Sequence, residues 1–311
     1  MTTRVRVRAL AKINLDLRVL GKRLDGYHEL RTVYQTISLA DRLSIAFTPA
    51  RRTAVILDAE VDIPDNLVIR AARACLDEMR VAAKLEFSLN KRIPMGAGLG
   101  GGSSDAAAVL LALPVLARRP LPVERLLALA GALGSDVPFF LLGGTAVGLG
   151  RGDELYPLPD PALPPRGVLV APGLHVSTAE AYRRLRRGAL TKVVTKNTIS
   201  IFQSRVWSLG GDPGVNDFEP PVFAQFPALA VLKRRLEKQG AEPAMMSGSG
   251  SSLFGLFRTP TQEDCALKSF RDQTAFPFSL VSRTRYRRLW WRWLGELTTE
   301  GEWPPRNRYS R

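Results

Sequence analysis

The stretch Pro94-Met95-Gly96-Ala97-Gly98-Leu99-Gly100-Gly101-Gly102-Ser103-Ser104-Asp105 is followed by the helix-forming run Ala-Ala-Ala-Val-Leu-Leu at 106–111. We call residues 94–104 the glycine loop. Five glycines within seven residues leave its backbone little shielded by side chains and free to adopt positive φ. Two serines and an aspartate then provide N-cap candidates for the helix. Because amide N–H groups converge at a helix N-terminus, where the dipole is positive, we interpret the loop as a phosphate cradle.

Two standard phosphate-binding signatures fit the glycine loop poorly. The P-loop signature ends in Gly-Lys-Ser/Thr, whereas Ser103 directly follows the last glycine here. A G-x-G-x-x-G spacing is present, but the dinucleotide fingerprint also needs a preceding strand in a βαβ unit and an acidic residue about twenty positions later. Glu124 lies near that spacing, yet it follows Pro122 at an expected helix start. Glycine-rich turns also occur in loops that bind nothing. Whether this loop binds phosphate therefore has to be inferred from the rest of the chain.

Composition predicts a soluble globular protein. With 311 residues, 45% hydrophobic and 23% charged, the chain can form one large domain or two ordinary ones. It contains no run of eighteen apolar residues, and its start, Met-Thr-Thr-Arg-Val-Arg-Val-Arg, lacks the apolar region of a signal peptide. We therefore expect a cytoplasmic location. Cys75 and Cys265 are expected as buried thiols on helices, not as a disulfide, and the widely spaced histidines and cysteines predict no metal cluster.

The formal net charge of +15 indicates either an anionic partner or an arginine-rich genome. Six basic residues fall within 183–196 and five arginines within 283–292. Such a surplus fits phosphorylated small molecules, a membrane surface or nucleic acid. A basic nucleic-acid-binding protein is therefore one hypothesis, although it leaves the glycine loop unexplained.

Hydrophobic periodicity predicts an α+β chain. Strands are expected over 4–10, 11–20, 32–39, 85–89, 167–171, 253–257 and 276–281, with a further hairpin formed by 43–47 and 53–58. Helices are expected over 66–80, 122–132, 179–187, 227–239 and 259–272, and the helix after the glycine loop is expected to end or kink at Pro114. The proline-rich segment 157–165 is the best linker candidate.

Lys12 and Asp136 are candidates for phosphoryl-transfer chemistry, which needs charge neutralisation and a group that deprotonates the acceptor hydroxyl. Lys12 shares a polar strand face with Asn14 and Asp16, and a solvated edge lysine is the plain alternative. In Gly134-Ser135-Asp136-Val137-Pro138, the aspartate is either a helix N-cap or a partly desolvated base kept ionised by a lysine.

Two further segments suggest ligand contacts. Tyr27-His28, after a glycine turn, could stack on and hydrogen-bond a heterocycle, or could simply pack that turn. Ser247-Gly248-Ser249-Gly250-Ser251-Ser252, which we call the serine loop, could form a second amide nest for a phosphate or diphosphate, or a tight turn between elements.

Taken together, these segments resemble the GHMP small-molecule kinases. The resemblance rests on Ala11-Lys12-Ile13-Asn14-Leu15 with Asp25-Gly26-Tyr27-His28-Glu29-Leu30, on the glycine loop, on Leu133-Gly134-Ser135-Asp136-Val137-Pro138 and on the serine loop. It implies a domain over 1–156 like the second domain of ribosomal protein S5, and a ferredoxin-like domain over 166–282, with the active site between them. A basic, tryptophan-rich extension over 283–311 follows, for which packing of Trp290 to Leu294 on the core is expected.

The resemblance also implies an activity, which is ATP-dependent phosphorylation of an alcohol. Asp-Gly-Tyr-His after Ala-Lys-Ile-Asn favours the branch whose acceptor is the 2-hydroxyl of 4-diphosphocytidyl-2-C-methyl-D-erythritol, in non-mevalonate isoprenoid biosynthesis. A kinase of the mevalonate or homoserine type is the alternative within the family. ATP with Mg²⁺ is then the co-substrate, with no tightly bound metal or organic cofactor and no nucleic-acid partner expected.

Roles follow from the positions that match the family. Asp136 corresponds to the base and Lys12 to the lysine that pairs with it. The ATP site would comprise Pro94, Met95, Gly96, Ala97, Gly98, Leu99, Gly100, Gly101, Gly102, Ser103, Ser104, Asn66 and Lys91. The acceptor site would comprise Asn14, Tyr27, His28, Tyr182, Gly248, Ser249 and Gly250, with the tyrosines and His28 placed at the cytosine. Residues 189–217 match poorly, so no contacts are assigned there.

Overall fold

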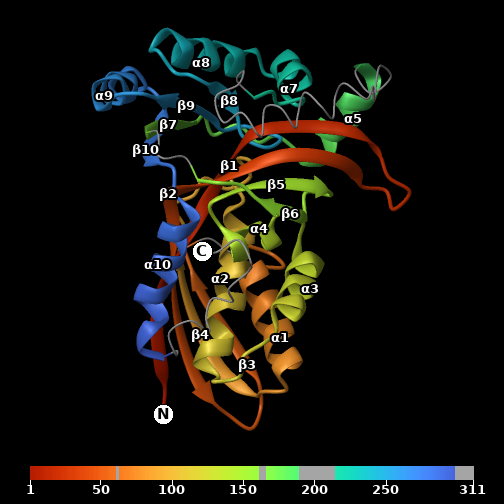
Figure 1. The fold of residues 1–311 in the computed structure, drawn as a ribbon, viewed down its shortest axis with the longest axis vertical. Helices are drawn as coiled ribbons and strands as arrows, with labels where there is room; N and C mark the ends of the chain where they lie inside the picture. Colours follow the sequence, from red (N-terminus) through yellow and green to blue (C-terminus); the bar gives the residue numbers. More distant parts are fainter. Residues whose placement is uncertain (61–62, 161–165, 189–213, 298–311) are drawn as a thin grey trace.

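Two long antiparallel strands, β1 (Thr3–Lys22) and β2 (His28–Pro49), connect the two halves of the protein (Figure 1). The computed structural model describes residues 1–60, 63–160, 166–188 and 214–297. Strands β1 and β2 pair from Thr3 opposite Phe47 to Lys22 opposite His28. The strands expected over 4–10 and 11–20 are therefore one element, interrupted only by shifts of register.

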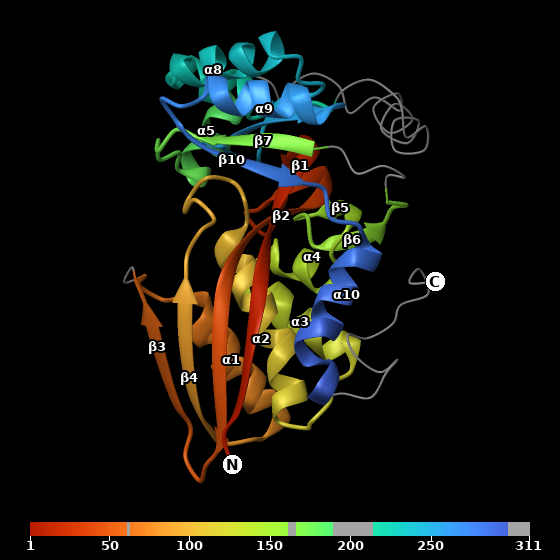
Figure 2. The same cartoon turned by 90° about the vertical axis from the view of Figure 1, so that its left-hand side faces the viewer.

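The first sheet contains six strands and carries helices on one face (Figures 1 and 2). Its order is β3 (Ala54–Ala59), β4 (Ala83–Asn90), β2, β5 (Thr145–Gly150) and β6 (Glu154–Pro157), with β1 paired to β2. The covering helices are α1 (Leu67–Met79), α2 (Gly101–Leu116), α3 (Val123–Leu133) and α4 (Val137–Leu142). Alternate β1 side chains, such as Val5 and Val7, enter this core, while the arginines between them are exposed.

The second sheet has four strands, in the order β10 (Thr274–Ser279), β7 (Arg166–Ala171), β9 (Leu253–Phe257) and β8 (Ala244–Met246). Among the described residues, the helices of this half are α5 (Thr178–Gly188), α7 (Glu219–Gln225), α8 (Pro227–Lys238) and α9 (Pro260–Ser269). Strand β7 is buried at every position after Arg166, which explains its continuous apolar sequence.

A separate apolar core lies where the two halves meet. It joins Ile13 of β1 and Ile37 of β2 to Leu99 of the glycine loop and Phe254 of the second sheet. All four side chains are at most 1% exposed. The glycine loop is thus seated on packed side chains from both halves, which fixes its position between them.

Helix α10 (Arg283–Leu294) follows the second sheet but packs back on the first half, beside β1 (Figures 1 and 2). Tyr286, Trp290 and Leu294 lie on its buried side, and Trp293 meets Trp290 edge to face. The expected packing of Trp290 to Leu294 is confirmed. Residues 298–311 of the expected extension lie outside the described residues, as do 161–165 of the expected linker and 189–213.

The predicted α+β class is confirmed, but the predicted hairpin of 43–47 and 53–58 is wrong. Strand β4 lies between β2 and β3, pairing antiparallel with the first and parallel with the second. The turn at 50–53 therefore separates strands that are not neighbours, and local sequence could not reveal the insertion.

The start and end of α2 also differ from prediction. Gly100, at φ +68°, occupies the N-cap without a side-chain hydrogen bond, so the serines and Asp105 lie within the helix. A Cβ on Gly100 would come within 2.8 Å of Phe140 Cζ, which explains why glycine stands there. Pro114 sits within the last turn, because the Ala117 amide still donates to the Leu113 carbonyl beyond it.

Both cysteines are free thiols, as predicted, but only Cys75 is buried. Burial raises the pKa of the Cys75 thiol to about 12. The expectation for Cys265 is wrong, because helix α9 buries Glu263 and Ala266 and leaves the cysteine exposed. Within the described residues, no helix is long and apolar enough to cross a membrane.

Candidate active site

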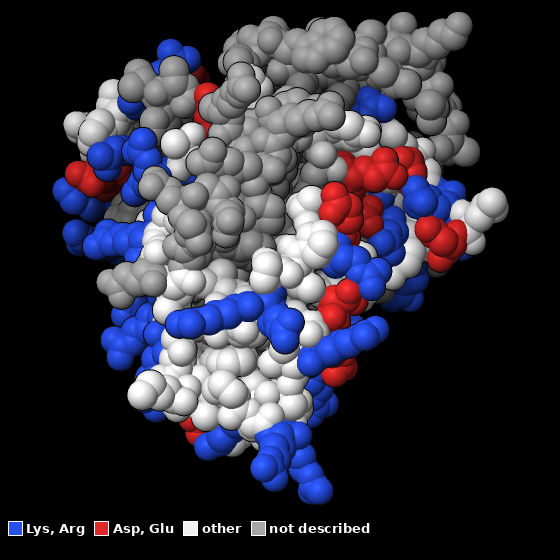
Figure 3. All heavy atoms as spheres, turned by 60° about the horizontal axis from the view of Figure 1, so that its bottom comes forward, with Lys and Arg blue, Asp and Glu red and all other residues white. Residues whose placement is uncertain are grey.

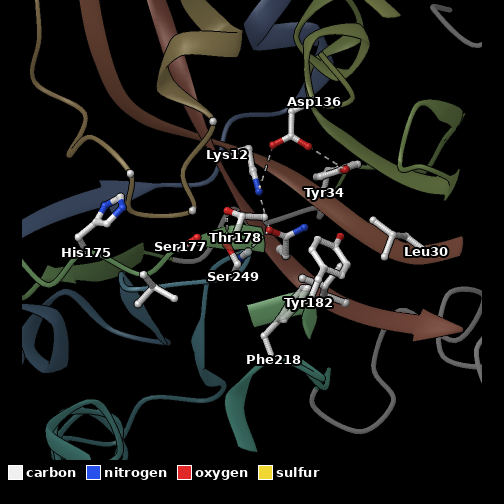
Figure 4. Close-up of a pocket in the computed structure, with 17 residues that line it drawn as sticks. Lys12, Leu30, Tyr34, Asp136, His175, Ser177, Thr178, Tyr182, Phe218 and Ser249 are labelled. Carbon is white, nitrogen blue, oxygen red and sulfur yellow. Dashed lines mark hydrogen bonds and ion pairs between the residues drawn. The ribbon is translucent and has the colours of Figure 1, made fainter. Parts of the chain in front are cut away.

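Three adjoining cavities open around the glycine loop, with volumes of about 410, 560 and 330 Å³. The first is shown in Figure 4 and is lined by residues of both halves. It shares Asp136 and Tyr182 with the second cavity, and Gly96, Gly98 and Gly100 with the third. Asp136 therefore stands between the cavity of Tyr27 and His28 and the glycine loop.

Lys12 and Asp136 meet at the centre of this cleft (Figure 4). The Lys12 Nζ lies 3.6 Å from Asp136 Oδ2, with the lysine side chain 4% exposed and the aspartate side chain 31% exposed. The alternative of a solvated edge lysine is thus wrong. Tyr34 donates its hydroxyl to Asp136 Oδ1 at 3.1 Å. Asp136 caps α4 by position but makes no capping hydrogen bond, so its carboxylate faces the cleft.

Asn14 connects Lys12 to the serine loop. Its Oδ1 accepts from Lys12 Nζ at 2.7 Å and from the Gly248 amide at 2.9 Å, and its Nδ2 donates to Thr32 Oγ1. Register shifts in β1 lie between Leu10 and Lys12 and again beyond Asn14. Such irregularities redirect side chains, and here they bracket the two polar residues that face the cleft.

The glycine loop is fixed by contacts that leave its inner backbone bare. The Lys12 amide donates to the Leu99 carbonyl at 3.0 Å, and Ser247 Oγ donates to the Gly98 carbonyl at 2.9 Å. Gly98 has φ +77°, and a Cβ there would lie 2.0 Å from the Ser247 carbonyl oxygen. Only glycine allows this approach.

Most residues predicted for ATP border the third cavity. These are Asn66, Lys91 and every residue from Pro94 to Ser103. Ser104 lies beneath the loop, where its hydroxyl donates to the Leu10 carbonyl at 2.7 Å. The N-terminus of α2 begins at Gly101, so free amides and the positive end of a helix dipole face this region.

Lys91 is held by two buried carboxylates, Asp41 and Asp105. Asp41 also accepts from the amides of Arg92 and Ile93, at 2.6 and 2.8 Å. The cluster thus joins the segment that enters the glycine loop to the helix that leaves it. Burial is the main cause that raises the pKa of Asp105 to about 7, against the lowering effect of Lys91. Repulsion from Asp41 adds to the increase.

The residues predicted at a cytosine lie in the second cavity. His28 is buried and stacks on Tyr182, with ring centroids 4.4 Å apart and planes at 19°. Phe218 meets Tyr182 edge to face, with ring centroids 4.8 Å apart. Tyr27 is 53% exposed, with the Arg151 guanidinium 5.0 Å from its ring centroid. Two positions 154 residues apart thus form one aromatic wall.

The serine loop borders the cleft through Gly248 and Ser249, while the Gly250 carbonyl is turned toward Gly98. Asn216 supports it, donating from Nδ2 to the carbonyls of Met246 and Gly248 at 2.7 and 2.8 Å.

Sequence reasoning missed several residues at the site: Tyr34, His175, Ser177, Thr178, Asn216 and Phe218. Tyr34 bonds to Asp136, 102 residues away, and Asn216 bonds to Met246 and Gly248, 30 and 32 residues away, which no local pattern signals. The pair Ser177-Thr178, before the helix expected over 179–187, is the available signal, and it indicates only a helix start.

Comparisons with known proteins agree with this architecture. Family models for the GHMP kinases N terminal domain and the GHMP kinases C terminal region match residues 66–144 and 207–273. A 4-diphosphocytidyl-2-C-methyl-D-erythritol kinase of Solibacter usitatus is 58% identical, over 99% of each chain. The protein of the same name from Pelotomaculum thermopropionicum is 41% identical, over 90% of this chain and 98% of that one.

Solved structures give the same result. A crystal structure of 4-(cytidine 5'-diphospho)-2C-methyl-D-erythritol kinase superposes with a TM-score of 0.75 at 39% identity, covering 88% of this chain and 98% of the other. Homoserine kinase from Cytophaga hutchinsonii shares the fold, with a TM-score of 0.65 at 17% identity and coverage of 90% and 95%. The 58% identity to the Solibacter usitatus kinase over the whole chain, against 17% to the homoserine kinase, places this chain with the former. The chain belongs to the 4-diphosphocytidyl-2-C-methyl-D-erythritol kinase family, a branch of the GHMP kinases.

Proposed function

We propose that this enzyme transfers the γ-phosphoryl group of ATP to the 2-hydroxyl of 4-diphosphocytidyl-2-C-methyl-D-erythritol, a step of non-mevalonate isoprenoid precursor biosynthesis. Family membership supports the kinase activity. The observation that carries the assignment of the site is the position of Asp136, between the glycine loop and the aromatic wall of His28 and Tyr182.

Asp136 acts as the base in this proposal. Its partly exposed carboxylate can accept a proton from an acceptor hydroxyl, while Tyr34 donates a hydrogen bond to one carboxylate oxygen and Lys12 lies near the other. Lys12 favours the ionised carboxylate and offsets the charge that builds on the transferring group. Because Lys12 is buried and fixed by Asn14, it needs little reorganisation when that charge develops.

The phosphates of ATP bind at the bare amides of the glycine loop and at the N-terminus of α2. Among the described residues, no group of three or more His, Cys, Asp or Glu could hold a metal ion by itself. In this proposal Mg²⁺ binds with the nucleotide phosphates, whose charge it offsets. The acceptor, in contrast, is positioned by side chains of the protein, which line the second cavity.

The second cavity takes the cytidyl diphosphate part of the acceptor. The His28–Tyr182 wall offers a flat aromatic surface for the base, and Arg151 and Arg183 border the same cavity. Their guanidinium groups match the charge of a diphosphate. Neither mevalonate nor homoserine would use both features.

A coupled ADP-release assay tests the proposal, with the cytidyl substrate, mevalonate, homoserine and galactose as acceptors. We expect turnover with the first only; faster turnover with another acceptor would overturn the substrate assignment. Asp136→Asn should lower kcat by about 10²- to 10⁴-fold with ATP affinity kept. Near-normal turnover of that variant would remove Asp136 from the role of base.

A further inference from the structure

The helices leave one face of the first sheet open (Figure 2), and exposed arginines gather on this face and at its edge. Arg4, Arg6 and Arg8 are exposed on β1, and Val5 and Val7 between them are buried. Alternate residues of a strand share a face, so the three guanidinium groups form a row along the sheet. Their spacing is about 6.6 Å, twice the rise per residue.

Neighbouring elements extend the row. Arg42 of β2 pairs with Arg8 in the sheet register, and Arg92 follows β4. On α10, the exposed residues Arg285, Arg288 and Arg292 are spaced for one side of the helix. Because α10 runs alongside β1, this second row flanks the first (Figures 1 and 2). We call these eight residues the arginine surface.

The positive charge of the arginine surface is poorly compensated. Among the described residues, none of its eight arginines forms an ion pair with a carboxylate. Burial, followed by repulsion from Arg42, Arg92 and Arg285, lowers the pKa of Arg8. Glu86 and Asp58 lie on nearby strands. Glu86 is paired with Lys84 at 2.7 Å, and attraction to Arg4 is the smallest of the causes that lower its pKa. Figure 3 shows Lys and Arg gathered along the left-hand margin, the side of α10 and the open sheet.

We propose that the arginine surface binds the phosphate backbone of double-stranded nucleic acid without reading its sequence. Arginine forks fit phosphate oxygens, and each phosphate that an arginine neutralises releases cations condensed on the duplex, which favours binding and makes it salt-dependent. On this face the described residues of β1 to β4 that point outward carry no aromatic ring, so stacking of single-stranded bases has no platform.

An acidic membrane is a poorer partner for the same surface. A helix that binds at a lipid interface inserts an apolar side, whereas Tyr286, Trp290 and Leu294 of α10 are all buried in the core. Ile56 of β3, which is 52% exposed, is the large apolar side chain that the open face presents among the described residues. Contact through phosphate charge alone is therefore favoured.

Binding of a fluorescein-labelled RNA duplex to the full chain, followed by anisotropy at rising NaCl, tests the proposal. Arg4→Gln with Arg6→Gln, and Arg288→Gln with Arg292→Gln, each remove two charges from separate rows. The matched control is Arg234→Gln with Lys238→Gln, two exposed residues of α8 at the other end of the molecule. Thermal unfolding and kinase turnover should be unchanged in all three pairs.

We expect each surface pair to weaken binding at least about tenfold and to reduce the slope of log K against log salt by about 1.8, while the control leaves the slope unchanged. Any one of four results overturns the proposal. These are an equal loss of affinity in the control pair, no binding of the duplex, tighter binding of a single strand than of the duplex, and binding to phosphatidylglycerol vesicles only. Because the two pairs lie on different elements, loss of fold in one leaves the other decisive.

Discussion

Lys12 Nζ lies 3.6 Å from Asp136 Oδ2 while donating a hydrogen bond to Asn14 Oδ1 at 2.7 Å. The lysine thus links the base proposed on α4 to the serine loop of the other half, through the Gly248 amide that shares Asn14. The position of the charge partner is consequently tied to the contact between the two halves.

Replacing Lys12 should therefore affect catalysis more than binding. For Lys12→Met we expect a fall in kcat of about 10²-fold or more, because charge on the transferring group loses a preorganised cation. The KM for ATP should change much less, since the loop amides remain. Steady-state kinetics check this, with Lys22→Met, a β1 residue outside the cleft, as the control. A KM effect with unchanged kcat would contradict the role.

The aromatic wall should determine affinity for the acceptor. His28→Ala and Tyr182→Ala should each raise the KM for the cytidyl substrate about tenfold or more, since base–aromatic stacking contributes about 1–3 kcal/mol. Their KM for ATP should stay near that of the parent enzyme. Tyr156→Ala, at an exposed tyrosine of β6, is the control. Equal increases in both KM values would indicate general loosening of the cleft instead.

Gly98 should tolerate no side chain. In Gly98→Ala, the new Cβ would lie 2.0 Å from the Ser247 carbonyl oxygen, so the glycine loop has to leave the serine loop. We expect the KM for ATP to rise about tenfold or more and the melting temperature to fall. Gly173→Ala is a matched control, because Gly173 also has a positive φ, +72°, but nothing lies within 4 Å of its Cβ position. Equal effects would assign the loss to backbone strain alone.

The sequence alone indicated the candidate site residues better than it indicated the contacts that hold them in place. The glycine loop, Lys12 and Asp136 stand in short segments whose residue types already limit what they can do. Tyr34, Asp41 and Asn216 carry no such signal, because their importance comes from partners brought close only by strand register and by the meeting of the two halves. The mistaken hairpin has the same origin: insertion of β4 beside β2 is a long-range choice.

The same limitation applies to Asp105, which the sequence suggested as a helix cap and the structure buries beside Lys91 and Asp41. Its pKa of about 7 in the folded protein lies above the ordinary aspartate pKa of 3.8. Between these two values the folded state binds more protons than the unfolded state. Asp105 therefore lowers the stability of the fold progressively as pH rises from about 4 to 7.

Asp105→Asn should remove that dependence, because the amide resembles the protonated acid in shape and does not titrate here. The variant should gain stability relative to the parent on going from pH 5 to pH 8, as measured by urea unfolding at both pH values. Asp77→Asn, at an exposed aspartate of α1, should show no such gain. A difference between variant and parent that is the same at both pH values would mean that Asp105 is ionised throughout and that Lys91 compensates both carboxylates.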